Sequence, residues 1–328
     1  MNSFIFALTA VLPIVITVAL GYFLKRIGFM DSDFAKKANK LVFRLFLPSM
    51  LFLNVYNISD IGSIDLGYVL YVLLALLAVF LIALPFVLFI TKENRKRGAL
   101  LQATFRSNYA LIGIPLATSL FGEEGTIVAT ILSAFTIPLL NILAVISLSV
   151  FREDGKKASI RGILLGIAKN PLIISVLLGV FALGIRSVFA KYQIAFRLSD
   201  IKPIFTVLKY LSGMATPLAL LVLGAQFEFS AIASLKKEIL FGTFARTVFV
   251  PILGIGTAFL FFRNSFTGAH FSAFVAIFAT PVAVSSVPMA QEMNSDSALA
   301  GQLVVWSTLI SAFTVFLVSF FLKLAGVF

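Results

Sequence analysis

Long apolar runs separated by short polar stretches make up most of this chain. A helix needs roughly 20 apolar residues to cross the hydrocarbon core of a bilayer, and ten runs have about that length. The pattern therefore predicts an all-α integral membrane protein with ten transmembrane helices. The predicted spans cover residues 4–24, 37–58, 66–91, 98–121, 125–150, 170–186, 203–227, 238–262, 269–292 and 297–323.

Landmark residues recur in the same order in the two halves of the chain. The segment from Pro13 to Gly21 matches that from Pro171 to Gly179, with the same spacing between Pro and Gly. The further pairs are Pro48 with Pro217, Pro115 with Pro281, and the Ser-Ala-Phe-Thr segments 133–136 and 311–314. A repeat of five spans places its second copy upside down in the membrane, and such inverted repeats are typical of secondary transporters.

The repeat also predicts how the chain is divided. We expect two inverted five-helix units, residues 1–151 and 170–328, joined by a linker at 152–169. The fourth span of each unit, 98–121 and 269–292, is interrupted by Pro and Gly, which remove a backbone donor or loosen a helix. We therefore expect spans 4 and 9 to be broken helices that cross.

Broken helices at matching places in the two repeats indicate where a substrate binds. Unpaired backbone groups at membrane depth are tolerated where they line a cavity or bind a ligand. The half-helices beyond the breaks would direct their positive N-terminal ends inward, which favours an anion. The alternative is a simple Pro kink, which is common in membrane helices.

The composition agrees with a membrane protein: 60% of the 328 residues are hydrophobic and 12% are charged. A soluble domain cannot bury so much apolar surface, whereas a bilayer covers it with lipid. The net charge of +12 does not indicate a nucleic-acid partner, because the basic residues lie mainly in short loops between apolar runs. The absence of Cys excludes disulfides and thiolate metal sites.

Most of these loop Lys and Arg residues fall on one side of the membrane if the N-terminus lies outside. The positive-inside rule then places the 152–169 linker in the cytoplasm. We therefore expect a multi-pass protein of the cell membrane with both termini extracytoplasmic.

Away from the span ends, the charges within the predicted spans are basic: Arg44, Arg106, Lys209 and Arg246. No Asp or Glu lies in the middle of a span, so the sequence favours an anionic substrate over a cation. Arg106 adjoins a break, although each of these Arg side chains could instead extend to the headgroups. Asn108 and Asn141 are the preferred ligand donors, because a buried amide is costly without a partner. The residues expected to bind substrate are Arg106, Asn108, Gly113, Pro115, Asn141, Pro281, Ser285 and Ser286.

The segments around both breaks resemble the auxin efflux carrier family, which includes bacterial malate and malonate permeases. Span 4 is similar to that family through Asn108 and the Gly-Ile-Pro-Leu run 113–116. Span 9 is similar through Pro281, Pro288 and the Ala-x-Glu-x-Asn run 290–294. Spans 1 and 7 add Pro13–Gly21 and the run 215–224, so the resemblance covers the whole chain.

The resemblance implies a transporter domain of spans 3–5 and 8–10, a scaffold of spans 1, 2, 6 and 7, a homodimer formed through the scaffold, and organic-anion ligands. Two features differ from the plant carriers of the family. The loop between spans 5 and 6 is short, and span 3 has no acidic residue. The resemblance therefore does not by itself imply auxin as substrate or proton coupling by that acid.

The sequence thus predicts a secondary transporter that moves a small carboxylate such as malate by alternating access. A sodium-coupled symporter of the bile-acid type, an intramembrane enzyme and a passive channel are the alternatives. An enzyme would need a nucleophile with a base, or a metal cluster, and the chain has no Cys, one His and no mid-span acid pair. We expect no catalytic residue, no metal site and no cofactor.

Overall fold

The computed structural model describes residues 2–57, 66–151, 165–166 and 168–328, with side chains from residue 12 onward. The described part is almost entirely helical, and its isolated β-bridge joins Ser107 to Val282. The predicted linker 152–169 lies mostly outside the described residues. The helical class expected from the sequence is therefore confirmed for the part of the chain that is described.

The described chain contains seven helical stretches that are long and apolar enough to cross a membrane. They are Ser32–Tyr56, Leu66–Ile90, Tyr109–Val150, Pro171–Lys191, Lys202–Gln226, Ala231–Phe262 and Ser297–Leu324.

The first half of the chain contains α1 (Asn2–Arg26), α2 (Ser32–Leu41), η1 (Val42–Phe46), α3 (Leu47–Tyr56), α4 (Leu66–Ile90), α5 (Asn94–Phe105), η2 (Tyr109–Gly113) and α6 (Ile114–Val150). The second half contains α8 (Pro171–Lys191), η3 (Leu198–Asp200), α9 (Lys202–Gln226), α10 (Ala231–Phe244), η4 (Ala245–Phe249), η5 (Ile252–Gly256), α11 (Thr257–Phe262), α12 (Gly268–Phe278), α13 (Ser286–Glu292) and α14 (Ser297–Leu324). Of the η segments, η3 is a 3₁₀-helix and the others are π-helices.

Polar caps mark where several helices begin. The side chain of Asp31 accepts a hydrogen bond from the Phe34 N–H before α2, and that of Asp296 accepts one from the Leu299 N–H before α14. Asn170 caps α8, whose first residue is a proline. Such residues satisfy backbone donors that have no partner within the helix.

Backbone torsion angles divide the long helix α6. Phe121 and Gly122 have non-helical angles, and Gly122 has a φ of 62°. Glycine takes a positive φ without the steric cost that a side chain would add. This division falls between the predicted spans 98–121 and 125–150, so the sequence placed the turn between them correctly.

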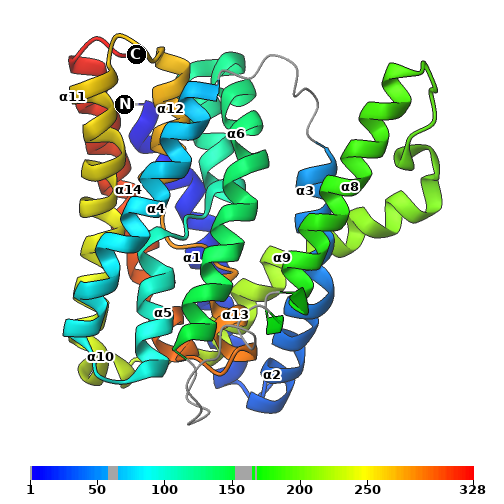
Figure 1. The fold of residues 1–328 in the computed structure, drawn as a ribbon. Coiled ribbons are helices and arrows are strands. Elements are labelled where there is room, and N and C mark those ends of the chain that lie inside the picture. Colours follow the sequence, from blue (N-terminus) through cyan, green and yellow to red (C-terminus); the bar gives the residue numbers. More distant parts are fainter. Residues whose placement is uncertain (1, 58–65, 152–164, 167) are drawn as a thin grey trace.

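One group of helices is built around α1, α3, α8 and α9, with α1 packed on α9 and α3 packed on α8. A Cβ added to Gly21 of α1 would overlap the carbonyl oxygen of Leu221, and one added to Gly224 of α9 would overlap that of Val18. Small residues allow such close approach of backbones in membrane proteins. In Figure 1, α3, α8 and α9 stand at one side of the molecule.

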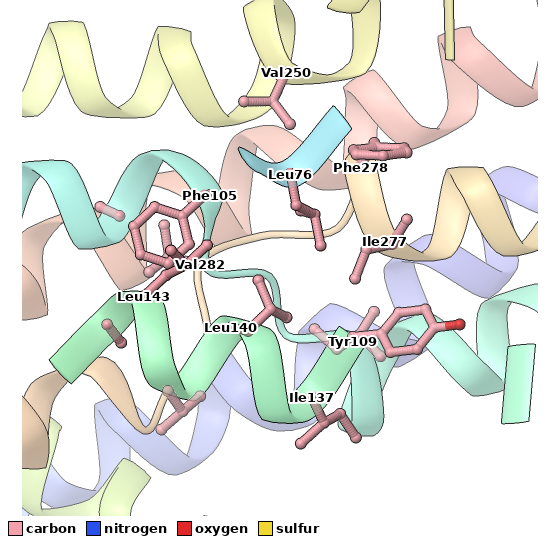
Figure 2. Packing of buried hydrophobic residues seen from close by; sticks show 14 of the residues in the cluster. Leu76, Phe105, Tyr109, Ile137, Leu140, Leu143, Val250, Ile277, Phe278 and Val282 are labelled. Carbon is pink, nitrogen blue, oxygen red and sulfur yellow. The ribbon is translucent and has the colours of Figure 1, made fainter. Parts of the chain in front are cut away.

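The second group contains α4, α5, α6, α10, α12, α13 and α14, in which α12 packs closely on α6. Its core is apolar, and Figure 2 shows Leu76 of α4, Phe105 of α5 and Phe278 of α12 pointing into the same space. The two ends of the chain lie at the same end of the molecule (Figure 1). The two helix breaks described below lie within this second group.

Candidate functional site

Two interrupted helices of the second group meet at their interruptions, a place called the crossing from here on. Between α5 and η2 the backbone is extended at Arg106, and between α12 and α13 it leaves the helix after Phe278. The Asn108 N–H donates to the Pro281 carbonyl at 2.8 Å, and the Ala283 N–H donates to the Arg106 carbonyl at 3.0 Å. Figure 2 shows the two extended segments running past each other beside Val282. Each break thus supplies partners for the other, as buried backbone requires.

The break in span 4 lies earlier in the chain than the sequence indicated. Pro115 lies within the helical stretch Tyr109–Val150, directly after η2, so the chain is helical on both sides of it. Gly113 belongs to η2, and a Cβ there would come within 2.7 Å of the Ala276 carbonyl oxygen. The prediction that these two residues interrupt the helix was therefore wrong: the chain is helical through Pro115, and Gly113 allows η2 to pack on α12.

The expected match of Pro115 with Pro281 does not hold in the structure either. Pro281 lies in the non-helical segment after α12, whereas Pro115 is helical. The β-bridge pairs Ser107 with Val282, so these two residues mark the centre of the crossing.

Arg246 in η4 holds the ends of both interrupted helices, and its side chain is fully buried. Its Nη1 donates to the carbonyls of Thr104 at 3.4 Å and Phe105 at 3.2 Å, at the C-terminus of α5. Its Nε donates to the Thr280 carbonyl at 2.8 Å, and its Nη2 donates to the Ile277 carbonyl at 2.7 Å, at the end of α12. The guanidinium group therefore satisfies carbonyls that two helix ends leave free.

Arg106 is also buried, and its neighbours are neutral. Its Nη2 donates to Asn141 Oδ1 at 2.8 Å, and its Nη1 contacts the sulfur of Met289. The Asn141 amide nitrogen donates in turn to the Ile137 carbonyl at 2.8 Å. No carboxylate lies within ion-pair distance of Arg106 among the described residues. The positive charge of Arg106 is thus not neutralised by an acidic side chain in this part of the chain.

Several polar atoms around the crossing are buried without a hydrogen-bond partner among the residues described. They are Asn108 Nδ2, Ser107 Oγ and Ser286 Oγ. A buried polar group without a partner costs roughly 1–3 kcal/mol, so such groups call for an explanation. A bound ligand or water would supply the missing partners.

A cavity of about 240 Å³ opens beside the crossing. Arg106, Asn108, Asn141 and Ser285 contribute to its wall from the crossing and from α6. The opposite wall comes from the first group of helices, and the residues that line it there are Leu47, Met50, Leu51, Asn54, Ala215, Thr216 and Ala219. The cavity therefore lies between the two groups of helices, with polar side chains from both.

The structure separates the predicted site residues into two sets. Arg106, Asn108, Asn141 and Ser285 line the cavity. The residues outside its lining are Gly113, Pro115, Pro281 and Ser286. Of these, Pro281 takes part through its carbonyl, which accepts from Asn108. Ser286 is buried at the start of α13.

Sequence reasoning missed other residues of this region. Asn54, Thr216 and Tyr109 also line the cavity and were not among the residues expected to bind substrate. Arg246 was identified as an in-span charge that could extend to the headgroups, but it is fully buried. The sequence did offer one signal for Arg246: no acidic residue lies one helical turn away to pair with it. Arg44, by contrast, has a 63% exposed side chain whose Nε lies 3.6 Å from Glu292 Oε2.

Comparison with known proteins agrees with this architecture. Residues 6–319 match the family described as membrane transport protein. The chain belongs to the auxin efflux carrier family. The family match covers both interrupted helices, the cavity and Arg246, so all of these features lie within the shared part of the chain.

Relatives within the family are named as transporters. The chain is 24% identical over 317 residues to an uncharacterized transporter of Methanothermobacter thermautotrophicus. This alignment covers 92% of this chain and 93% of the relative. It is 28% identical over 257 residues to an uncharacterized transporter of Methanocaldococcus jannaschii, and this alignment covers 76% of this chain and 77% of the relative. It is 26% identical over 294 residues to the uncharacterized transporter YfdV of Escherichia coli K12, and this alignment covers 86% of this chain and 87% of the relative. The family and these relatives are transporters rather than enzymes, so the protein is assigned to membrane transport.

Proposed function

We propose that this protein carries a small organic anion, such as malate or malonate, across the cell membrane, and that the anion binds in the cavity at the helix crossing. The observation that carries this proposal is Arg106, a buried guanidinium at the cavity wall with neutral neighbours. A buried charge is costly unless it is paired. A substrate carboxylate would supply the charge that the described side chains around Arg106 lack, and Arg can hold it through two parallel hydrogen bonds.

The remaining polar groups suit a carboxylate as well. Asn108 Nδ2 is a donor without a partner in the described chain, and it belongs to the same cavity wall as Arg106. Asn141 and Ser285 add polar groups on the same wall. Apolar residues of α3 and α9 form most of the opposite wall, which suits a small substrate with few polar groups beyond its carboxylates.

Alternating access would arise from movement of the second group of helices against the first. The cavity lies between the groups, so their relative displacement would expose it to one side and then to the other. In this proposal α1, α3, α8 and α9 form the scaffold, which is also the surface for a homodimer. The helices that carry the crossing form the moving domain.

We also propose ten membrane passes arranged as two inverted repeats. The position of the breaks supports this arrangement, because each half of the chain has one interrupted helix and the two interruptions meet at Ser107 and Val282. The glycine landmarks support it too. Gly21 lies where α1 meets α9, and Gly179 lies where α8 meets α3, with a Cβ there placed 2.9 Å from Val55 Cβ. Equivalent glycines thus make equivalent close contacts in the two halves.

Substitution of Arg106 tests the proposal. We expect Arg106→Gln to lower the affinity for malate or malonate roughly 10–100-fold, since a hydrogen bond to a charged group contributes about 1.5–3 kcal/mol. Arg106→Lys should have an intermediate effect, because it keeps the charge but loses the planar fork. Affinity is measured on purified protein from the rise in melting temperature with ligand, and transport from uptake of labelled carboxylate into proteoliposomes.

Arg44→Lys is the matched control, because it makes the same exchange on an exposed side chain. If Arg106→Lys binds as well as the wild type, Arg106 does not contact the ligand. Stabilisation by amines or neutral sugars, with none from any carboxylate, would overturn the anion assignment. Uptake that disappears when choline replaces sodium would instead favour a sodium-coupled symporter.

A further inference from the structure

Arg246 has a role that its burial alone does not explain. It lies outside the cavity wall, yet each nitrogen of its guanidinium group donates to a carbonyl at the end of α5 or α12. These two helices have 12 and 11 residues and end at the crossing. A helix C-terminus carries the equivalent of about half a negative charge, so the two ends together present about one negative charge.

That negative charge opposes Arg106. The α5 helix ends at the residue before Arg106, and the segment after α12 is hydrogen-bonded to the Arg106 backbone. Without a counter-charge, the two helix ends would offset about one positive charge at the cavity, which is the whole charge of Arg106. An anion would then be attracted mainly by the positive N-terminal ends of the helical stretch that begins at Tyr109 and of α13.

We propose that Arg246 is a positioning residue for the anion: it neutralises the C-terminal ends of α5 and α12 and thereby leaves the charge of Arg106 available to the substrate. This inference rests on the proposed anion transport. It assigns two buried guanidinium groups to different tasks, since Arg106 lines the cavity and Arg246 reaches backbone carbonyls. The same four hydrogen bonds hold the two broken helices at a fixed separation.

The geometry of the hydrogen bonds explains why the residue is arginine. Arg246 reaches carbonyls of two different helices from a third element, η4, and the planar guanidinium group offers five donors in a fixed fork. Lys would keep the positive charge with three donors from a single nitrogen. Gln would keep two donors without the charge. The two substitutions therefore separate the charge from the hydrogen bonds.

The test compares Arg246→Gln and Arg246→Lys using two probes of similar size, malonate as a dianion and its half-amide malonamate as a monoanion. The effect of a lost charge scales with the charge of the ligand, so Arg246→Gln should weaken malonate binding at least tenfold and malonamate binding about threefold. Arg246→Lys should bind both probes within about threefold of the wild type. Lys209→Gln, which removes a positive charge from an exposed position on α9, should leave both affinities unchanged.

Ligand-free melting temperature is measured for each variant to separate folding from binding. A purely structural Arg246 would lower this temperature in both variants and weaken both probes by the same factor, which would overturn the proposal. If Arg246→Gln does not fold, Arg246→Lys decides: wild-type affinity supports the charge role, and a loss as large as that of Arg106→Gln overturns it. If the wild type binds neither probe, the anion function itself fails, which is a different result from failure of Arg246 alone.

Discussion

Asn108 shows how a single residue can be costly to the fold and useful to the site. Its side chain is buried, it lines the cavity, and its Nδ2 has no hydrogen-bond partner in the described part of the protein. Its backbone is already used, because its N–H donates to Pro281 and its carbonyl accepts from Ile112 and Gly113. The side chain is therefore free to serve a ligand, whereas the backbone supports the crossing.

We expect Asn108→Ala to abolish transport of the labelled carboxylate while expression and folding are retained. The fold should not suffer, because the substitution removes a buried donor that costs roughly 1–3 kcal/mol when it has no partner. The melting temperature of the ligand-free protein should stay the same or rise. Uptake into proteoliposomes and thermal unfolding of the purified protein measure the two effects separately.

Asn264→Ala, in the exposed turn after α11, is the matched control for the loss of one amide and should transport normally. A lower melting temperature in Asn108→Ala would mean that the amide supports the fold. Normal transport would place the site elsewhere.

At the scale of elements, the contact between α1 and α9 depends on glycine. Gly224 of α9 approaches the Val18 carbonyl of α1 so closely that a Cβ would overlap it. Gly213 lies on the same helix, is exposed, and has no atom within 4 Å of an added Cβ. The two positions therefore offer the same substitution with opposite packing consequences.

We expect Gly224→Ala to destabilise the protein by about 1–3 kcal/mol, as overpacking against a neighbour does. Gly213→Ala should be neutral or stabilising by roughly 0.5–1 kcal/mol, because alanine loses less backbone entropy in a helix. Thermal unfolding in detergent measures both. Equal stability of the two variants would show that α1 and α9 do not pack as closely as the structure places them.

At the scale of the whole molecule, the orientation in the membrane follows from the charges in the loops. The two chain ends lie at the same end of the fold (Figure 1), as a chain with an even number of passes requires. The excess of Lys and Arg in the loops on the other side predicts that the termini face outward. The chain has no Cys, so single cysteines can report this orientation.

We expect Ser3→Cys to react with a membrane-impermeant thiol reagent on intact cells, and Ala158→Cys to react only after lysis. Both positions have side chains outside the described residues, so the test depends on the loop charges alone. The unmodified chain is the control for background labelling. Labelling of Ala158→Cys but not of Ser3→Cys on intact cells would reverse the orientation.

The sequence by itself determined the class of the protein, a helical membrane transporter. Length and hydrophobicity of a run are local properties, and the requirement that backbone groups be paired in lipid turns such runs into helices. The same local reasoning identified Arg106, Asn108 and Asn141, because charges and amides within apolar spans are costly and therefore informative, and it identified Ser285 from the interruption of span 9. These four residues lie at the cavity.

Only the tertiary structure decided where the helices break and what the buried charges contact. Pro115 was expected to interrupt its helix, but the chain is helical on both sides of it. The break falls at Arg106–Asn108 because segment 281–283 and Arg246, more than 130 residues away in the chain, supply partners for the freed backbone groups. A partner so distant in sequence leaves no local pattern, so the function of Arg246 could be inferred only after the fold had brought these groups together.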